Sequence, residues 1–274
     1  MATRTKKSGQ RKAFVVGIAA FASVCLIATG FAAWVISAKA EKKETGNVDI
    51  GKVSSADVKI EVAQEEGTTG VLSAGNGFSF NPDANDDSGR VRYDGKNGEK
   101  RDLHLNGTVG PQRFVTSFKI RLDIAAKDNG TDGKPVKDDE ANKRFKAAET
   151  AGYIVLPPCF DNDVELYGTD AYKEDTSKDN NAKANFAYDI KFTWGSTFGG
   201  KNPGRYYDEV EAGKAVSDAD VSKTLNDFYK ALTGEDPTTA GGDTTSEDQT
   251  TVQDGQLKFL VTLTADTAKK EGSK

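Results

Sequence analysis

The sequence is short of the residues on which most catalytic and metal sites depend. It has one histidine, His104, and two cysteines, Cys25 and Cys159, in 274 residues. A Ser-His-Asp site would have to use His104, and no Gly-x-Ser-x-Gly turn is present to carry its serine. A zinc site with two histidine ligands is excluded. We therefore expect no enzyme, no catalytic residues, no metal ligands and no cofactor.

Acidic residues are missing from the first forty positions, and residues 13–38 carry no charge at all. Five basic residues precede that apolar segment, a pattern typical of an export signal or a membrane anchor. The segment is long enough to cross a bilayer as a helix. Small residues around Ala32 and Ala33, and at Ala38-Lys39-Ala40, offer two cleavage sites. Cleavage and retention both stay open, and either one predicts a secreted or cell-surface protein.

After residue 40 the charge balance reverses. This part of the chain has 31 basic and 42 acidic residues, a net charge of −11. Such a surface repels nucleic-acid phosphates and favours solubility outside the cell. Nucleic acid is therefore excluded as a partner. Cys159 is the single cysteine of this part, so no disulfide framework is expected, and we predict a buried thiol at a strand end.

The strongest structural signal is a two-residue alternation of apolar and polar side chains. A strand places successive side chains on opposite faces, so each alternating segment is expected to bury one face. Four segments show it: residues 58–62, 118–124, 186–194 and 257–263. The apolar set of the third is Phe186, Tyr188, Ile190, Phe192 and Trp194. We expect this set to share one face of a central strand and to pack against Phe118, Ile120 and Leu122.

Shorter strand candidates are separated by turns rich in Asp, Asn and Gly. These candidates are residues 77–80, 91–93, 103–109, 153–156 and 164–167. Many short, one-sided strands predict an all-β antiparallel sandwich of the jelly-roll type. Apolar residues at helical spacing predict one peripheral helix over 217–234, and residues 138–150 are a weaker second helix.

This reading divides the chain into four parts. Residues 1–40 form the signal peptide or hydrophobic anchor helix, and residues 41–53 a linker and candidate donor strand. Residues 54–266 form the β-sandwich domain, and residues 267–274 a polar tail.

Two further candidate sites carry weak signals. Asp83, Asn85 and Asp87 have the alternate oxygen spacing of a calcium loop, but Ser88 stands where such a loop needs glycine. Plain turns share this composition, so whether a calcium loop exists between Asp83 and Asp94 stays open. We expect His104, within an alternating segment, to be a solvent-facing strand residue.

The order of motifs resembles that of TasA/camelysin-type exported proteins. The resemblance rests on the apolar segment that ends at residues 29–34, the first-strand pattern at residues 45–50, and the segment at residues 192–203. The family-like residues of that last segment are Trp194, Gly195, Phe198, Gly199, Gly200, Asn202 and Pro203. The resemblance implies a secreted or cell-wall-associated jelly roll whose copies build biofilm-matrix fibres by inserting an N-terminal strand into a neighbour's sheet. It also implies a metal-dependent proteolysis, attributed to camelysin-type members, for which this sequence has no zinc motif.

A donated strand also fits the sequence itself. Val48, Ile50 and Val53 give residues 41–53 an apolar side that could complete an open sheet edge. Pairing within the same chain and pairing with a neighbour both stay open. The predicted function is a structural subunit of a cell-surface or biofilm-matrix fibre, with itself or other surface proteins as partners. The alternative is a monomeric, membrane-anchored module that binds carbohydrate or protein through Trp194, Tyr206 and Tyr207.

Overall fold

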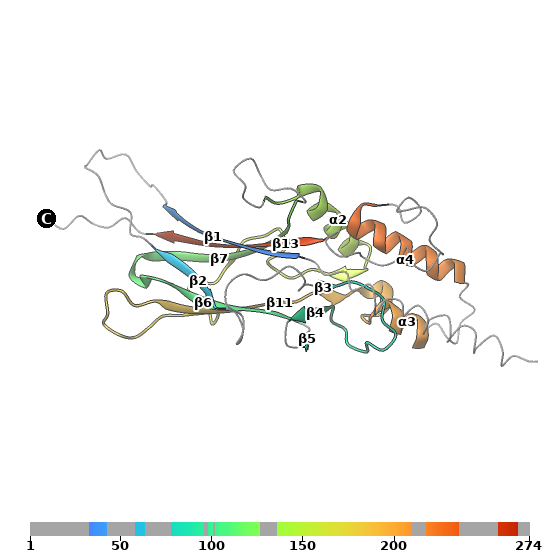
Figure 1. Cartoon of the computed structure of the whole chain (residues 1–274), viewed down its shortest axis with the longest axis horizontal. Coiled ribbons are helices and arrows are strands. Elements are labelled where there is room, and N and C mark those ends of the chain that lie inside the picture. Colours follow the sequence, from blue (N-terminus) through green and yellow to red (C-terminus); the bar gives the residue numbers. More distant parts are fainter. Residues whose placement is uncertain are drawn as a thin grey trace, which may run out of the picture.

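The computed structural model describes residues 33–42, 58–63, 78–95, 98–100, 102–126, 136–209, 218–235 and 257–267. Within them, two four-stranded sheets face one another at one end of an elongated molecule, and the helices gather at the other end (Figure 1). Apart from β1, the strands pair antiparallel. The predicted β-rich, mainly antiparallel fold with few short helices is thus confirmed.

The first of these sheets, sheet I, has the strand order β1-β13-β7-β9. Its strands are β1 (Ala33–Lys42), β13 (Lys258–Thr267), β7 (Val115–Ile124) and β9 (Val164–Glu165). Sheet II has the order β10-β11-β6-β2. Its strands are β10 (Tyr172–Lys173), β11 (Ala184–Ile190), β6 (Leu103–Gly110) and β2 (Lys59–Ala63). A short 3₁₀ turn, Gln112–Phe114, joins β6 to β7 and so links the two sheets.

Two smaller sheets extend the molecule toward the helices. One has the order β3-β4-β5, formed by β3 (Phe78–Ser79), β4 (Arg92–Gly95) and β5 (Gly98–Lys100). The other pairs β12 (Thr193–Trp194) with β8 (Ile154–Val155). The helices are α2 (Asp139–Thr150), α3 (Pro203–Glu209) and α4 (Asp218–Thr233). None of the helices in the described part of the chain has the length and apolar character needed to cross a bilayer.

The buried core runs from between the two sheets into the helical end. Phe118 of sheet I packs on Phe186 of sheet II, with ring centroids 4.9 Å apart. Toward the helices, Phe192 lies 4.7 Å from Phe78 and 5.7 Å from Phe259. Edge-to-face ring contacts of this kind add stability beyond the apolar area they bury. The same core therefore supports both ends of the molecule.

The predicted central strand over residues 186–194 is correct in its burial and wrong in its continuity. Four of its five apolar residues are buried and Tyr188 is half-buried. However, β11 ends at Ile190, which pairs with Leu103, the first residue of β6. The chain then takes new partners, since the Phe192 carbonyl accepts from the Val91 N–H at 3.0 Å. The alternation of apolar and polar residues continues past the end of β11 because the same side of the chain stays buried.

Only the end of the predicted N-terminal apolar segment lies within the described residues. Residues 1–32, which include most of the apolar segment, lie outside the described residues. Residues 33–38 were expected to complete an apolar helix, and the structure instead has them in β1. Sequence cannot separate a buried strand from a helix in an uninterrupted apolar run. The partner of β1 is also the last strand of the chain, more than two hundred residues away.

Candidate functional site

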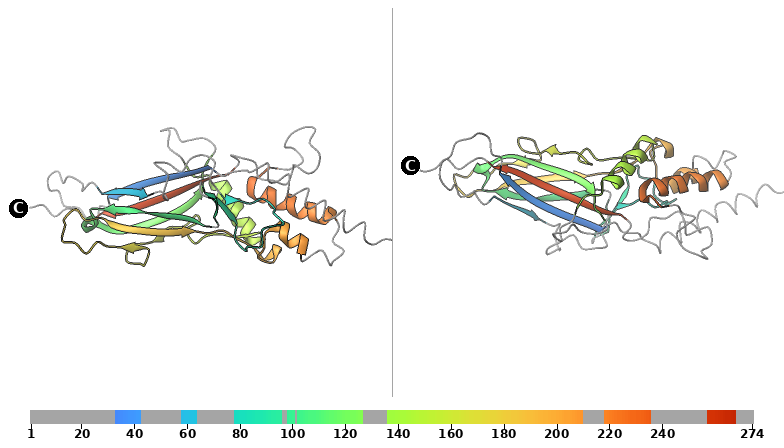
Figure 2. Two further views of the ribbon diagram at one scale, coloured as in Figure 1. Left: turned by 60° about the horizontal axis from the view of Figure 1, so that its bottom comes forward. Right: turned by 90° about the horizontal axis from the view of Figure 1, so that it is seen from above.

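The most distinctive arrangement in the structure is the pairing of β1 with β13. All ten residues of β1 are in register with β13, from Ala33 opposite Lys258 to Lys42 opposite Thr267, and the two strands run parallel. Among the described strands β13 is the one hydrogen-bonded neighbour of β1, so β1 forms the edge of sheet I, with β2 of sheet II also in contact with it. Figure 2 shows the two strands side by side along the whole length of the sheet.

The β13 side of this contact is strongly apolar. Phe259, Val261, Leu263 and Ala265 alternate along β13 and are each fully buried. Their register partners on β1 are Trp34, Ile36, Ala38 and Ala40. Each series begins with a large aromatic residue and ends with alanine. β1 therefore matches β13 in pattern as well as in length.

The residues predicted to form the donor strand are not part of β1. Val48, Ile50 and Val53 fall outside the described residues, so their predicted role stays a prediction. The strand that occupies the edge of sheet I is 33–42, which covers the end of the predicted signal or anchor segment (residues 1–40) and the first two residues of the predicted linker and donor strand (residues 41–53). A signal was available, because apolar and polar residues alternate from Ile36 to Glu41.

The family-like segment forms a tight corner between β12 and α3. Trp194 is buried and contacts Phe198 and Phe228, at centroid distances of 6.3 Å and 5.9 Å. A Cβ at Gly195 would lie 2.1 Å from the carbonyl oxygen of Gly152, so only glycine fits there. Gly199 has a φ of 60°, in the left-handed region that favours glycine. Gly200 shares this conformation, with a φ of 72°.

Asn202 fastens this corner to the loop that follows β3. Its Oδ1 accepts from the backbone N–H of Asp83 at 2.7 Å and from that of Gly204 at 2.9 Å. Its Nδ2 donates to the carbonyl of Asn81 at 3.3 Å. Pro203 follows as the first residue of α3, a position that suits proline because its missing N–H would have no helical partner. α3 was not predicted from the sequence, although the Asn-Pro pair is a helix-start signal.

The predicted aromatic surface is therefore wrong. Trp194 and Tyr207 are 2% and 7% exposed, because their rings pack within the helical end. Tyr206 is half-buried against Tyr207, at a centroid distance of 5.2 Å. These rings are not free to stack on a ligand.

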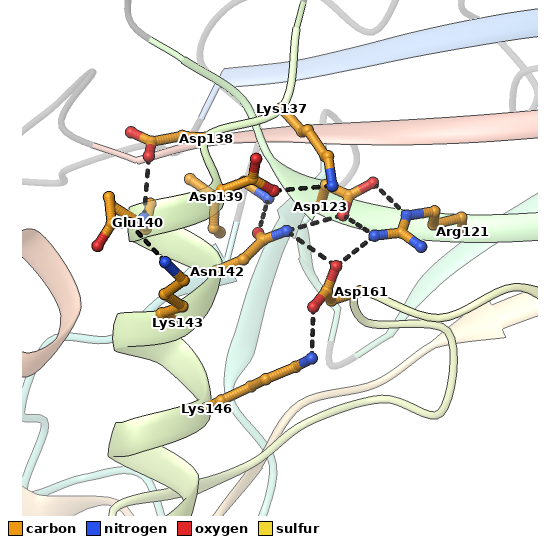
Figure 3. Close-up of polar contacts among 12 residues, drawn as sticks. Arg121, Asp123, Lys137, Asp138, Asp139, Glu140, Asn142, Lys143, Lys146 and Asp161 are labelled. Atoms are coloured by element: carbon orange, nitrogen blue, oxygen red, sulfur yellow. Dashed lines mark hydrogen bonds and ion pairs between the residues drawn. The ribbon is translucent and has the colours of Figure 1, made fainter.

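A polar cluster ties α2 to sheet I (Figure 3). Arg121 on β7 donates to both carboxylate oxygens of Asp123, at 2.8 and 2.9 Å. Asn142 on α2 donates to Asp123 at 2.8 Å and accepts from the backbone N–H of Ile124 at 2.7 Å. Asp161 accepts from Arg121 and from Lys146 of α2. We call these five polar residues (Arg121, Asp123, Asn142, Lys146 and Asp161) the α2 clamp.

The electrostatics of the α2 clamp are those of a structural joint. The Asp123 side chain is 3% exposed, and each of its oxygens accepts a hydrogen bond. Asp123 raises the pKa of Arg121, and hydrogen bonding from Lys146 lowers the pKa of Asp161. Both shifts stabilise the charged forms, so Arg121 and Asp161 remain ionised at neutral pH. A carboxylate enclosed in this way holds elements together and presents no free oxygen to a substrate.

His104 and Cys159 have the exposure and burial predicted for them, but Cys159 lies in a turn after β8 and not at a strand end. His104 is exposed on β6, and its Nδ1 lies 2.5 Å from Asp189 Oδ1 on the neighbouring β11. It is thus a solvent-facing strand residue in a cross-strand pair. Cys159 is fully buried, and burial raises the pKa of its thiol to about 12. A thiol of that pKa is not nucleophilic near neutral pH.

The candidate calcium loop is organised by its own backbone. Asp83 Oδ1 accepts from the N–H of Asn85 at 2.9 Å, and Asp86 Oδ1 accepts from the N–H of Ser88 at 3.0 Å. These are Asx turns, a common local use of aspartate. Within the described ranges, no group of three or more His, Cys, Asp or Glu side chains is placed to hold a metal ion.

Comparisons with protein-family models, with curated proteins and with solved structures find no match for this chain. The resemblance to TasA/camelysin-type proteins therefore rests on the sequence motifs alone.

Proposed function

We propose that the protein is an extracellular structural subunit whose copies join by exchanging the strand β1. It would be secreted or held at the cell surface, in a fibre or matrix built mainly of the chain itself. The proposal includes a jelly-roll arrangement of the two sheets, as the family resemblance implies. It assigns the protein no catalytic activity.

The observation that supports this proposal is the way β1 joins the molecule. Among the described strands it contacts sheet I through β13 alone, along one edge and over ten residues. Fifteen residues, 43–57, separate it from the next described residue, Val58. An edge strand joined to its domain by a long connection can be replaced by the same strand of another copy without new contacts. This is the basis of strand addition and domain swapping.

The connection also sets when exchange occurs. A tether of this length gives β1 an effective concentration on the order of a millimolar for its own sheet. Dilute protein should therefore keep β1 in its own sheet, and crowding at a cell surface should favour exchange. Assembly is accordingly expected to depend on concentration.

Two variants of the full chain, each with one added cysteine and with Cys25→Ser, test the exchange directly. Ser37 on β1 and Thr262 on β13 are register partners, at a spacing that a disulfide can bridge. When Ser37→Cys and Thr262→Cys chains are mixed and oxidised, exchange predicts a covalent dimer that contains one copy of each. The buried Cys159 should not compete.

A matched control pairs Ser37→Cys with Asp170→Cys, an exposed position beside β10 at the far edge of sheet II. This mixture should give no specific dimer. The proposal fails if a double variant, Ser37→Cys with Thr262→Cys, forms only bonds within one chain while the mixture stays monomeric at every concentration.

The alternative, an anchored binding module, depended on an exposed aromatic surface formed by Trp194, Tyr206 and Tyr207. Its three aromatic side chains are packed within the helical end, as described above. The exchange proposal is the one that an observed feature supports.

A further inference from the structure

Of the peptide bonds in the N-terminal region that satisfy the small-residue rule of signal peptidases, one directly precedes β1 and one lies within it. Residues 30–32, Gly-Phe-Ala, place small residues at the third and first positions before the Ala32–Ala33 bond. Residues 38–40, Ala-Lys-Ala, do the same before the Ala40–Glu41 bond. The sequence alone does not choose between them.

The two products differ in whether they contain β1. The strand begins at Ala33, directly after the first bond, and it spans the second bond. Cleavage after Ala40 would leave two of the ten residues of β1. The backbone of β13 would then lose eight of the ten register partners in its parallel ladder.

That loss would open one side of β13, a strand with buried apolar residues. Phe259, Val261 and Leu263 are fully buried when β1 is present. A long apolar edge with unpaired backbone groups is a site of aggregation. Peptidases cut the chain before it folds, so the fold does not shield the second bond. What distinguishes the bonds is that only one product can complete sheet I.

We infer that the exported chain is hydrolysed between Ala32 and Ala33. Water adds across this bond, leaving a carboxylate on Ala32 and an amine on Ala33, and the mature chain begins with the first residue of β1. This inference rests on the export in the proposed function and deepens it. A β1 that starts at a free N-terminus can leave one sheet and enter another without carrying an upstream segment with it.

The test is to express the full chain in an exporting bacterium and to sequence the N-terminus of the protein recovered from the medium and the cell surface. Intact mass gives a second readout, since the two products differ by eight residues. We expect the sequence Ala33-Trp34-Val35. Sequencing reports the cut itself and does not require a variant to fold.

Two matched substitutions sharpen the result. Ala32→Gln removes the small residue before the inferred bond and should leave uncut precursor in the membrane fraction. Ala40→Gln makes the same change before the second bond and should leave the N-terminus at Ala33. For each variant, the measured quantity is the fraction of the recovered protein whose N-terminus is Ala33.

Three outcomes would overturn the inference while leaving export in place. They are an N-terminus at a residue other than Ala33, such as Phe31 or Glu41, loss of processing in the Ala40→Gln chain, or an uncut chain at the cell surface. Recovery of the protein from the cytoplasm alone would instead overturn export, and with it the proposed function.

Discussion

At the scale of single residues, stability depends on side chains that are either fully apolar and buried or polar and fully paired. Ile190 represents the first kind, since it is fully buried on β11 opposite Leu103. Asp123 represents the second, since its buried carboxylate is enclosed by Arg121 and Asn142. Removing either kind should be costly, and neighbouring exposed residues provide the controls.

The Ile190→Ala variant should lower the free energy of unfolding by about 2–5 kcal/mol, because it removes buried methyl groups and leaves a cavity. The adjacent Lys191 is partly exposed and pairs with Asp102 and Asp189 at 3.5 and 3.3 Å. The Lys191→Ala change should cost less than about 0.5 kcal/mol, since such surface pairs contribute little. Urea denaturation of the two variants measures both values, and equal losses would contradict the assigned register.

The α2 clamp should make stability depend on pH through Asp161. Lys146 and Arg121 lower the pKa of this carboxyl below its ordinary value of 3.8 in the folded state. The group therefore binds protons more readily when unfolded, and its contribution is fully present above about pH 4. That contribution is lost as the pH falls through the folded pKa.

The Asp161→Asn variant should be less stable at neutral pH and should lose less stability than the native protein on acidification below about pH 4. Asparagine tolerates the left-handed backbone at this position, where φ is 49°. Thermal unfolding from pH 2 to pH 7 measures the effect. Asp163→Asn is the control, because Asp163 is 59% exposed and 4.0 Å from Arg121. An unchanged slope in the Asp161→Asn protein would show that the clamp does not titrate as described.

At the scale of elements, the sequence predicted those strands whose partners continue their alternation. The segments at 118–124 and 257–263 became β7 and β13, which pair with one another. It did not predict where a strand changes partner, as after Ile190, because that depends on where β6 begins. It also did not predict α3. The start of this helix is fixed by Asn202, which accepts a hydrogen bond from the Asp83 N–H, 119 residues earlier in the chain. Hydrogen bonds to backbone groups far away in the sequence produce no local periodicity, so the elements that depend on them cannot be predicted from a sequence pattern.

The start of α3 should depend strongly on Asn202. The Asn202→Ala variant leaves the N–H groups of Asp83 and Gly204 without their acceptor. Each buried donor left unpaired costs about 1–3 kcal/mol, so we expect a loss of roughly 2–4 kcal/mol in unfolding free energy. Asn162→Ala is the matched control, since Asn162 is exposed and makes one bond, to the Pro158 carbonyl. Equal effects of the two substitutions would mean that the corner does not hold the β3 loop.

The loop after β3 should be stable without a metal ion. Its carboxylates at Asp83 and Asp86 already accept from the backbone of the same loop. Adding a calcium chelator should therefore shift the melting temperature by less than about 1 °C, because no ligand that binds only the folded state is removed. A large drop that calcium restores would instead identify the segment between Asp83 and Asp94 as a calcium loop.

At the scale of the whole molecule, the positions of two strand ends determine how exchange can proceed. Lys42, the last residue of β1, is opposite Thr267, and Thr267 pairs with Val115. Lys59, the first residue of β2, pairs with Gly110. Residues 111–114 join Gly110 to Val115, so β1 ends and β2 begins at the same end of the two-sheet body, away from the helices.

This geometry permits two kinds of exchange. Two copies can meet at these ends and trade strands reciprocally, which closes a pair with two-fold symmetry. Alternatively, each copy can donate to the next and form an open chain, but then the ends of three copies must lie within reach of their connections. The fifteen residues of 43–57 reach about 50 Å when extended, which leaves room for an open chain.

Connection length should therefore decide between a closed pair and a growing chain. Shortening residues 43–57 to six residues reduces the reach to roughly 20 Å, about the width of a four-stranded sheet. We expect the shortened protein to stop at two subunits, while the native length gives assemblies that grow with concentration. Light scattering across a concentration series measures this, and a Gly/Ser connection of the native fifteen residues is the control. A shortened protein that remains monomeric at every concentration, with β1 open to proteolysis, would mean that β1 does not enter a neighbour's sheet and that the exchange proposal is wrong.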